Sequence, residues 1–151
     1  MVLCESTAPN QMSMSGLGDV FELRVFLERH CARLAAQRAT KRQLQKMEGV
    51  LANLEWLRDG DLKSLLVIDR EFHRLLYAAS DNEYLAEVLT RLYDLSVPLR
   101  GRGLGGLKDG RAWIEQHLKV LSALKAGDDA EAARLVEQHV VASRQRVLAV
   151  V

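Results

Sequence analysis

The chain has little cysteine, little proline and no block of like charge. Its 151 residues include two cysteines and two prolines. Cys4 and Cys31 lie far apart and match no CxxC metal pattern, which is typical of free thiols in a reducing compartment. The 21 basic and 20 acidic residues are interspersed and leave a net charge of +1. The composition therefore argues against a disulfide scaffold and against a nucleic-acid-binding surface.

Long apolar runs, a signal sequence and strand patterns are also missing. No stretch approaches the length of a membrane span, and the opening MVLCESTAPNQMSMSGLG has no basic start followed by an apolar segment. We therefore expect a cytoplasmic protein without a membrane partner. Neither GxxxxGK nor a GxGxxG turn after a strand occurs, so no nucleotide site is predicted.

What the chain does have is helical periodicity. Beyond a flexible tail over 1–18, apolar residues recur at three- and four-residue intervals, which indicates helices packed on one core. Thr40 with Gln43, and Asp128 with Glu131, have the spacing of capping boxes. Short links favour one all-α domain over 19–151, an antiparallel bundle of six to seven helices. The predicted helices cover 19–38, 40–58, 61–80, 82–98, 109–125 and 128–151, and the glycine-rich stretch 100–110 is predicted to be a mobile loop.

Four polar residues fall on the apolar faces of three predicted helices. Asp69 and His73 lie four residues apart and share the inward face of 61–80. His117 and His139 lie on the inward stripes of 109–125 and 128–151. For any one of them, a hydrogen bond to a carbonyl or an Asp69–His73 ion pair is the simpler explanation. Together, with no Lys or Arg on those stripes, they favour one shared divalent metal ion in the bundle core.

The predicted metal centre would have a net positive charge. One carboxylate and three neutral imidazoles leave a divalent ion with a charge of about +1 and, if it is octahedral, about two open positions. Such a centre suits a small carboxylate or hydroxy acid. The mixed ligand set favours zinc or nickel and also fits manganese or iron. His30 is predicted to be a packing or capping residue, and Arg24 to form a surface pair with Glu28.

The chain contains the segments VFELRVFLERHCARLAAQRAT, DREFHRLLYAASDNEYL and EQHLKVLSALKAGDDAEAARLVEQHV. Over about 19–151 these segments resemble the FCD ligand-binding domain of FadR-type regulators in the GntR superfamily. The resemblance implies a homodimeric effector-sensing domain whose ion is held by Asp69, His73, His117 and His139. It also implies a small organic acid as effector, bound at the ion with help from Arg24, and Asn82 is a second candidate ligand-binding residue.

The chain departs from that family at its start, where such regulators carry a winged helix-turn-helix. DNA contact would therefore need a domain that is missing from this chain. We predict a sensor and not an enzyme. A metal-dependent hydrolase or lyase would need a general base beside the ion, and the third, fifth and sixth predicted helices offer none. A free-standing metal-binding dimerisation module and a metal-free structural bundle are the remaining alternatives.

Overall fold

The computed structural model describes residues 12–53, 61–103 and 107–150. These residues form six α-helices and no strand, which confirms the all-α prediction. The helices are α1 (Met14–Arg38), α2 (Lys41–Ala52), α3 (Leu62–Ala79), α4 (Glu83–Gly103), α5 (Leu107–Lys125) and α6 (Asp129–Val150).

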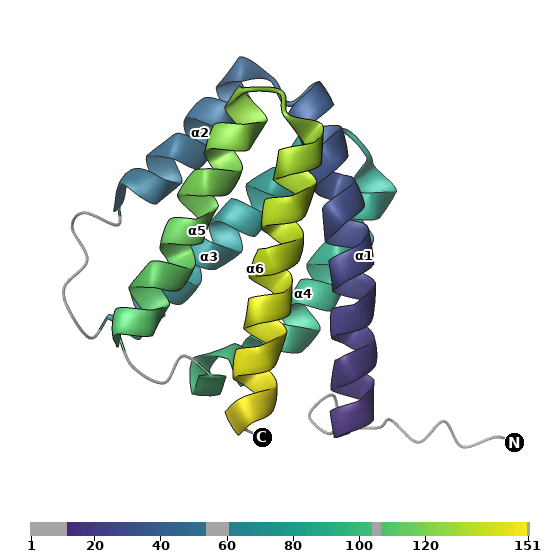
Figure 1. Cartoon of the computed structure of the whole chain (residues 1–151), viewed down its shortest axis with the longest axis vertical. Helices are drawn as coiled ribbons and strands as arrows, with labels where there is room; N and C mark the ends of the chain where they lie inside the picture. Colours follow the sequence, from purple (N-terminus) through teal and green to yellow (C-terminus); the bar gives the residue numbers. More distant parts are fainter. Residues whose placement is uncertain (1–11, 54–60, 104–106, 151) are drawn as a thin grey trace, which may run out of the picture.

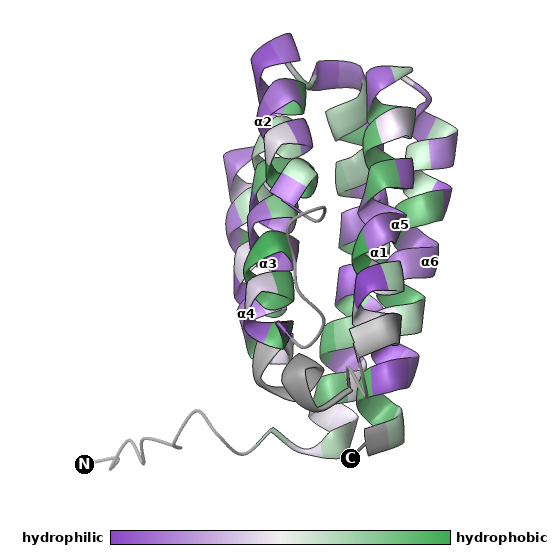
Figure 2. Ribbon diagram, turned by 90° about the vertical axis from the view of Figure 1, so that its left-hand side faces the viewer, coloured by the Kyte–Doolittle hydropathy of each residue, from purple (hydrophilic) through white to green (hydrophobic). Residues whose placement is uncertain are grey.

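The helices pack in two layers. Figure 2 shows α2, α3 and α4 on one side and α5, α6 and α1 on the other. In Figure 1, α6 lies in the middle of the front layer, between α5 and α1, and α3 and α4 lie behind it. Contacts of α3 with α5 and of α4 with α1 and α6 close the layers on each other. The space between α3, α5 and α6 is therefore interior.

Side-chain caps set most helix ends where the sequence predicts them. Thr40 and Gln43 form both hydrogen bonds of a capping box at the start of α2. Asp128 accepts from the Glu131 amide in front of α6 at 3.0 Å, while the Glu131 carboxylate binds Arg134. The first helix differs from the prediction, because Ser13 caps it and it begins at Met14 instead of residue 19. The predicted end of the second helix at residue 58 lies outside the described residues.

The glycine-rich stretch is more helical than predicted. The fourth helix continues through Gly103, and the fifth begins at Leu107, so most of the predicted loop over 100–110 is helix. Glycine weakens a helix by about 1 kcal/mol per residue without forbidding it, and continued backbone hydrogen bonding outweighs that cost here. Residues 104–106 lie outside the description.

The core contains large apolar side chains and, beside them, charged ones. Trp113, Phe21 and Phe72 are each at most 1% exposed. On α1 the buried stripe also includes Arg24 and Glu28, both 0% exposed. Arg24 and Glu28 do form the predicted pair, but the predicted surface location of this pair is wrong. Both residues continue the helical spacing that starts at Leu17 and runs through Phe21 to Cys31 and Ala35.

The other face of α1 exposes two large apolar side chains among charged ones. Leu23, predicted to point inward, is 50% exposed, and Phe26 is 74% exposed. Within the described residues, no helix is both long enough and apolar enough to cross a membrane.

Candidate metal centre

The four predicted metal ligands come from both layers and meet in the interior. Asp69 and His73 lie on α3, one turn apart, His117 lies on α5 and His139 on α6. None is more than 2% exposed. Each sits within an apolar stripe of its helix, so the same burial that folds the bundle carries the polar groups inward. The sequence prediction of four inward-facing groups is confirmed.

Their ligand atoms converge on one point. One atom from each residue lies within 4.8 Å of every other. The Oδ1 atom of Asp69 is 3.3 Å from Nε2 of His73, 3.2 Å from Nε2 of His117 and 3.9 Å from Nε2 of His139. The Nε2 atom of His73 is 3.3 Å from that of His117 and 3.4 Å from that of His139. One carboxylate oxygen thus faces three imidazole nitrogens.

The other nitrogen of each imidazole faces an oxygen. Nδ1 of His117 lies 2.9 Å from the Ile114 carbonyl, and Nδ1 of His139 lies 2.8 Å from Oε1 of Gln116. Nδ1 of His73 lies 3.2 Å from Oε2 of Glu28. The Ile114 carbonyl and an ionised Glu28 carboxylate can only accept, so Nδ1 of His117 and of His73 donate to them. With the Gln116 amide oriented as it is, Nδ1 of His139 donates as well. The Tyr77 hydroxyl also lies 3.4 Å from Nδ1 of His73.

This tautomer gives the centre its chemistry. A neutral imidazole protonated at Nδ1 has a lone pair on Nε2, so three lone pairs and a carboxylate oxygen face one another. They repel unless a proton or a cation lies among them. One proton relieves the repulsion of a single contact, whereas one divalent ion can accept lone pairs from all four residues. Imidazole with carboxylate is a common donor set for such ions. The residues present therefore form a buried group that can hold a metal.

Aromatic rings fix the imidazoles from the sides. The Trp113 ring stacks on His139 with centroids 5.4 Å apart and planes 15° apart. Phe72 meets the His117 ring edge-on at 4.5 Å. The apolar walls raise the strength of electrostatic interactions at the centre by lowering the local dielectric.

Burial and the carboxylates act on the imidazoles in opposite directions. Burial lowers the pKa of His117, and the nearby Asp69 only partly offsets this. Burial also disfavours protonated His73, but Asp69 and Glu28 together outweigh it and raise the pKa of His73. The two imidazoles therefore differ although both face the same carboxylate oxygen.

A second group of polar residues surrounds the centre. The hydroxyl of Tyr93 donates to Oδ2 of Asp69. The Ser96 hydroxyl donates to the Tyr93 carbonyl at 2.7 Å and accepts from Nη1 of Arg24 at 2.9 Å. Arg24 also binds Glu28, whose other oxygen faces His73. A continuous chain of contacts thus links the α1 pair to both α3 ligands.

Sequence reasoning missed several of these residues. Glu28 was recognisable, because it lies one turn after Arg24 on the stripe that begins at Leu17. Tyr93 shares a buried face of α4 with Ser96, at a spacing of three. Gln116 is half-buried beside His117 and carries no sequence signal of its own.

The structure separates the remaining predicted residues. Arg24 lies within the buried network, whereas Asn82 is exposed, accepts from the Leu85 amide at 3.1 Å and caps α4. Asn82 lines an open surface hollow with Arg38 and Tyr84. The structure therefore does not bring it together with the four ligands, and its ligand-binding role stays a prediction. His30 is exposed on α1, so it is not a core residue.

Fold and site together define a two-layer helical domain with a buried carboxylate–imidazole centre. Comparison with known proteins identifies the family of this domain, because the family model of the FCD domain matches residues 19–142. The chain belongs to the FCD domain family.

Its relatives are transcriptional regulators. It is 32% identical over 137 residues to the Nta operon transcriptional regulator of Aminobacter aminovorans, covering 89% of this chain and 63% of that protein. It is 27% identical over 127 residues to the HTH-type transcriptional repressor NanR of Cronobacter sakazakii, covering 82% of this chain and 48% of NanR. The chain thus spans about half to two thirds of the length of these relatives.

Two solved structures share the fold. A GntR protein of Streptococcus agalactiae matches with a TM-score of 0.71 and 27% identity, over 85% of this chain and 58% of that one. E. coli McbR/YncC matches with a TM-score of 0.80 over 92% of this chain and 67% of that one. At 20% identity, the latter likeness concerns the fold alone.

Proposed function

We propose that this chain is the effector-sensing domain of a GntR-type transcriptional regulator and binds a small carboxylate or hydroxy acid at a divalent metal ion. The observation that carries the proposal is the convergence of Asp69 Oδ1 with three Nε2 atoms whose rings are held by acceptors at Nδ1. In metal sites of proteins, a hydrogen bond from Nδ1 to an acceptor fixes the ring, so that the lone pair on Nε2 points at the metal.

The ligand class follows from charge. A bound divalent ion would supply net positive charge and open positions for an anion. Arg24 adds a second buried positive charge in the same network. Burial alone would lower the pKa of Arg24, but Glu28 outweighs it and raises that pKa above the ordinary value, so the guanidinium stays charged. A carboxylate is the anion that a guanidinium binds with two parallel hydrogen bonds.

Zinc or nickel is the proposed ion, with manganese or iron as alternatives. Three imidazoles favour the later metals of the first transition row over magnesium or calcium. The single carboxylate among the four ligands supports the same choice.

We further propose that the domain acts as a homodimer and reaches DNA only through a winged helix-turn-helix domain outside this chain. The two relatives are regulators, and the basic residues of this chain are interspersed with acidic ones in the sequence, with a net charge of +1. A regulator of this kind works in the cytoplasm.

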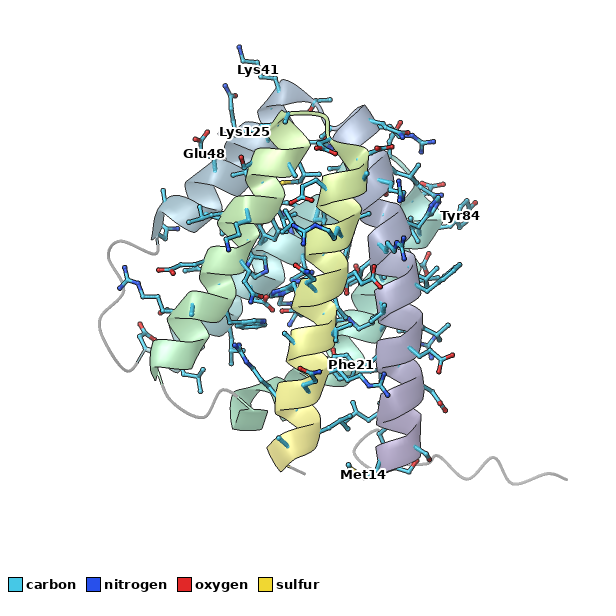
Figure 3. The ribbon with its side chains drawn as sticks, in the orientation of Figure 1. Met14, Phe21, Lys41, Glu48, Tyr84 and Lys125 are labelled. Atoms are coloured by element: carbon cyan, nitrogen blue, oxygen red, sulfur yellow. The ribbon has the colours of Figure 1, made fainter. Side chains whose placement is uncertain are left out.

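Exposed apolar side chains on α1 and α4 support the dimer. Phe26 and Tyr84 are each 74% exposed, Leu23 is 50% exposed and Val88 is 47% exposed. Figure 3 shows Tyr84 projecting away from the bundle, and α1 packs beside α4. Replacing Phe26 with Glu should convert a dimer to a monomer in light scattering after size exclusion. A dimer that survives the change would place the interface elsewhere.

The decisive experiment has two stages. Elemental analysis of the purified chain should find about one divalent ion per chain. Carboxylic and hydroxy acids are then titrated by calorimetry against metal-loaded protein and against protein stripped with a chelator. Binding of at least one acid to the loaded form only is expected. A loaded protein that binds no acid of any class, or a protein that takes up no metal, would overturn the proposal.

No hydrolytic function is proposed, because the buried carboxylates among the described residues are Asp69, itself a proposed ligand, and Glu28. Glu28 is the additional buried acid, and it faces Nδ1 of His73, whereas the converging atoms are the Nε2 nitrogens.

A further inference from the structure

Glu28 is buried between an arginine and a candidate metal ligand and contacts both. Its Oε1 atom accepts from Nε of Arg24 at 2.7 Å and lies 2.6 Å from Nη2. Its Oε2 atom lies 3.2 Å from Nδ1 of His73. All of this occurs at 0% exposure for Arg24 and Glu28 and 2% for His73. Two contacts with the guanidinium of Arg24 at these distances favour the ionised form of the Glu28 carboxylate.

The three imidazoles are therefore held in different ways. His117 donates to a backbone carbonyl of its own helix, and His139 donates to the neutral amide of Gln116. His73 donates to the carboxylate of Glu28 on α1, which is also bound by Arg24 of the same helix. A carboxylate partner makes an imidazole a stronger donor to a metal than a neutral partner does.

We propose that Glu28 is a positioning residue that couples Arg24 to the metal ligand His73. The proposal rests on the proposed function, because it concerns how the same centre responds to an acid. While Arg24 holds one oxygen, the carboxylate divides its charge between guanidinium and imidazole. When an acid draws Arg24 toward itself, more of that charge acts on the His73 N–H.

The consequence is reciprocal. A stronger hydrogen bond at Nδ1 makes Nε2 of His73 a better ligand, so binding of an acid tightens metal binding through Glu28. By linkage, the metal tightens acid binding by the same factor. Neither His117 nor His139 takes part, because the hydrogen bonds of Arg24 among the described residues go to Glu28 and Ser96 and not to Ile114 or Gln116.

Proton NMR of the full chain loaded with Co²⁺ tests this directly, with the metal alone as the probe. Each ring bound through Nε2 keeps an exchangeable proton on Nδ1, which the paramagnetic ion shifts far from other signals, so three such signals are expected. Glu28→Gln should move the His73 signal and leave those of His117 and His139 in place. It should also weaken Co²⁺ affinity by about 10- to 100-fold in a chelator competition.

Two further variants test the link to the arginine. Arg24→Gln should move the His73 signal when Glu28 is present and should leave it unmoved in the Glu28→Gln background. A long-range charge effect would move all three signals in both backgrounds. The double variant, Arg24→Gln with Glu28→Gln, replaces a buried ion pair with two neutral amides. Unlike each single variant, it leaves no unpaired charge in the interior, so it should fold even if a single variant does not. Glu131→Gln, the same change in an exposed pair with Arg134, is the matched control and should alter neither readout.

The outcomes separate this inference from the proposed function. If the unaltered chain binds no Co²⁺, the proposed function fails. If it binds Co²⁺ but Glu28→Gln or the double variant keeps its affinity and its His73 signal, only the role of Glu28 is refuted. The same holds if Arg24→Gln moves the three signals equally.

Discussion

Replacing Asp69 with Asn should abolish the stabilisation that a metal ion gives the fold. The four ligands come from three helices and span residues 69 to 139 of the chain. The unfolded chain therefore cannot hold them together, and the ion binds the folded state alone. A ligand with that preference, present at 100 times its Kd, stabilises a protein by about 2.7 kcal/mol.

The size of the chain converts this energy into a melting shift. For 151 residues, each kcal/mol moves Tm by about 2–4 °C, so zinc or nickel should raise Tm by about 5–11 °C. Asn keeps the shape of Asp and an oxygen that can accept from Tyr93, but it lacks the charge that faces three imidazoles. The metal-free variant should therefore melt close to the unaltered protein, and added metal should leave its Tm unchanged.

Differential scanning fluorimetry with and without a chelator is the assay. Asp94→Asn is the matched control. It makes the same chemical change at an exposed position, where Asp94 pairs with Arg70. It should keep the full metal shift. A full shift in Asp69→Asn, or none in the unaltered chain, would refute the interpretation of the centre.

Three other predictions concern packing, capping and thiol reactivity. Leu76→Ala removes a side chain that is 0% exposed and should lower the free energy of unfolding by about 2–5 kcal/mol in urea titrations; a loss below about 1 kcal/mol would contradict the packing. Thr40→Ala should cost about 1 kcal/mol, because it removes the acceptor for the Gln43 amide, and an unchanged urea midpoint would contradict that cap. Burial raises the pKa of Cys31 from 9.0 to about 12, so the thiol stays protonated at pH 8. Alkylation of Cys31 at pH 8 should therefore be about 10³-fold slower in the folded chain than in the unfolded chain. Rapid labelling of Cys31 in peptide mass spectra would contradict its burial.

The sequence was sufficient for the fold class and for the inward placement of the four candidate ligands, because both depend on helical periodicity. Asp69 and the three histidines stand on stripes whose other members are apolar, so their inward direction follows from spacing alone. Arg24 and Glu28 were assigned to the surface because two opposite charges one turn apart usually form an exposed pair. Their burial depends on α4 and α3 supplying Ser96 and His73, and such tertiary partners leave no trace in local spacing.

The details of the support around the ligands could not be predicted for a related reason. The anchor of His139 comes from α5 and the anchor of His73 from α1, so each depends on how two helices are aligned along their axes. The helical continuation through residues 100–103 was missed because glycine lowers helix propensity while tertiary packing and hydrogen bonding decide the outcome.

Because α1 is one continuous helix, a small rotation of α1 near Glu28 would displace its first turn by a larger distance. Glu28 lies 14 residues after Met14, which at about 1.5 Å per residue is about 21 Å along the axis. If α1 pivots by about 5° near Glu28, its first turn moves by about 2 Å, which is the scale of helix shifts in switching proteins. Any segment joined in front of α1 would be displaced by that amount while the residues at the pivot hardly move.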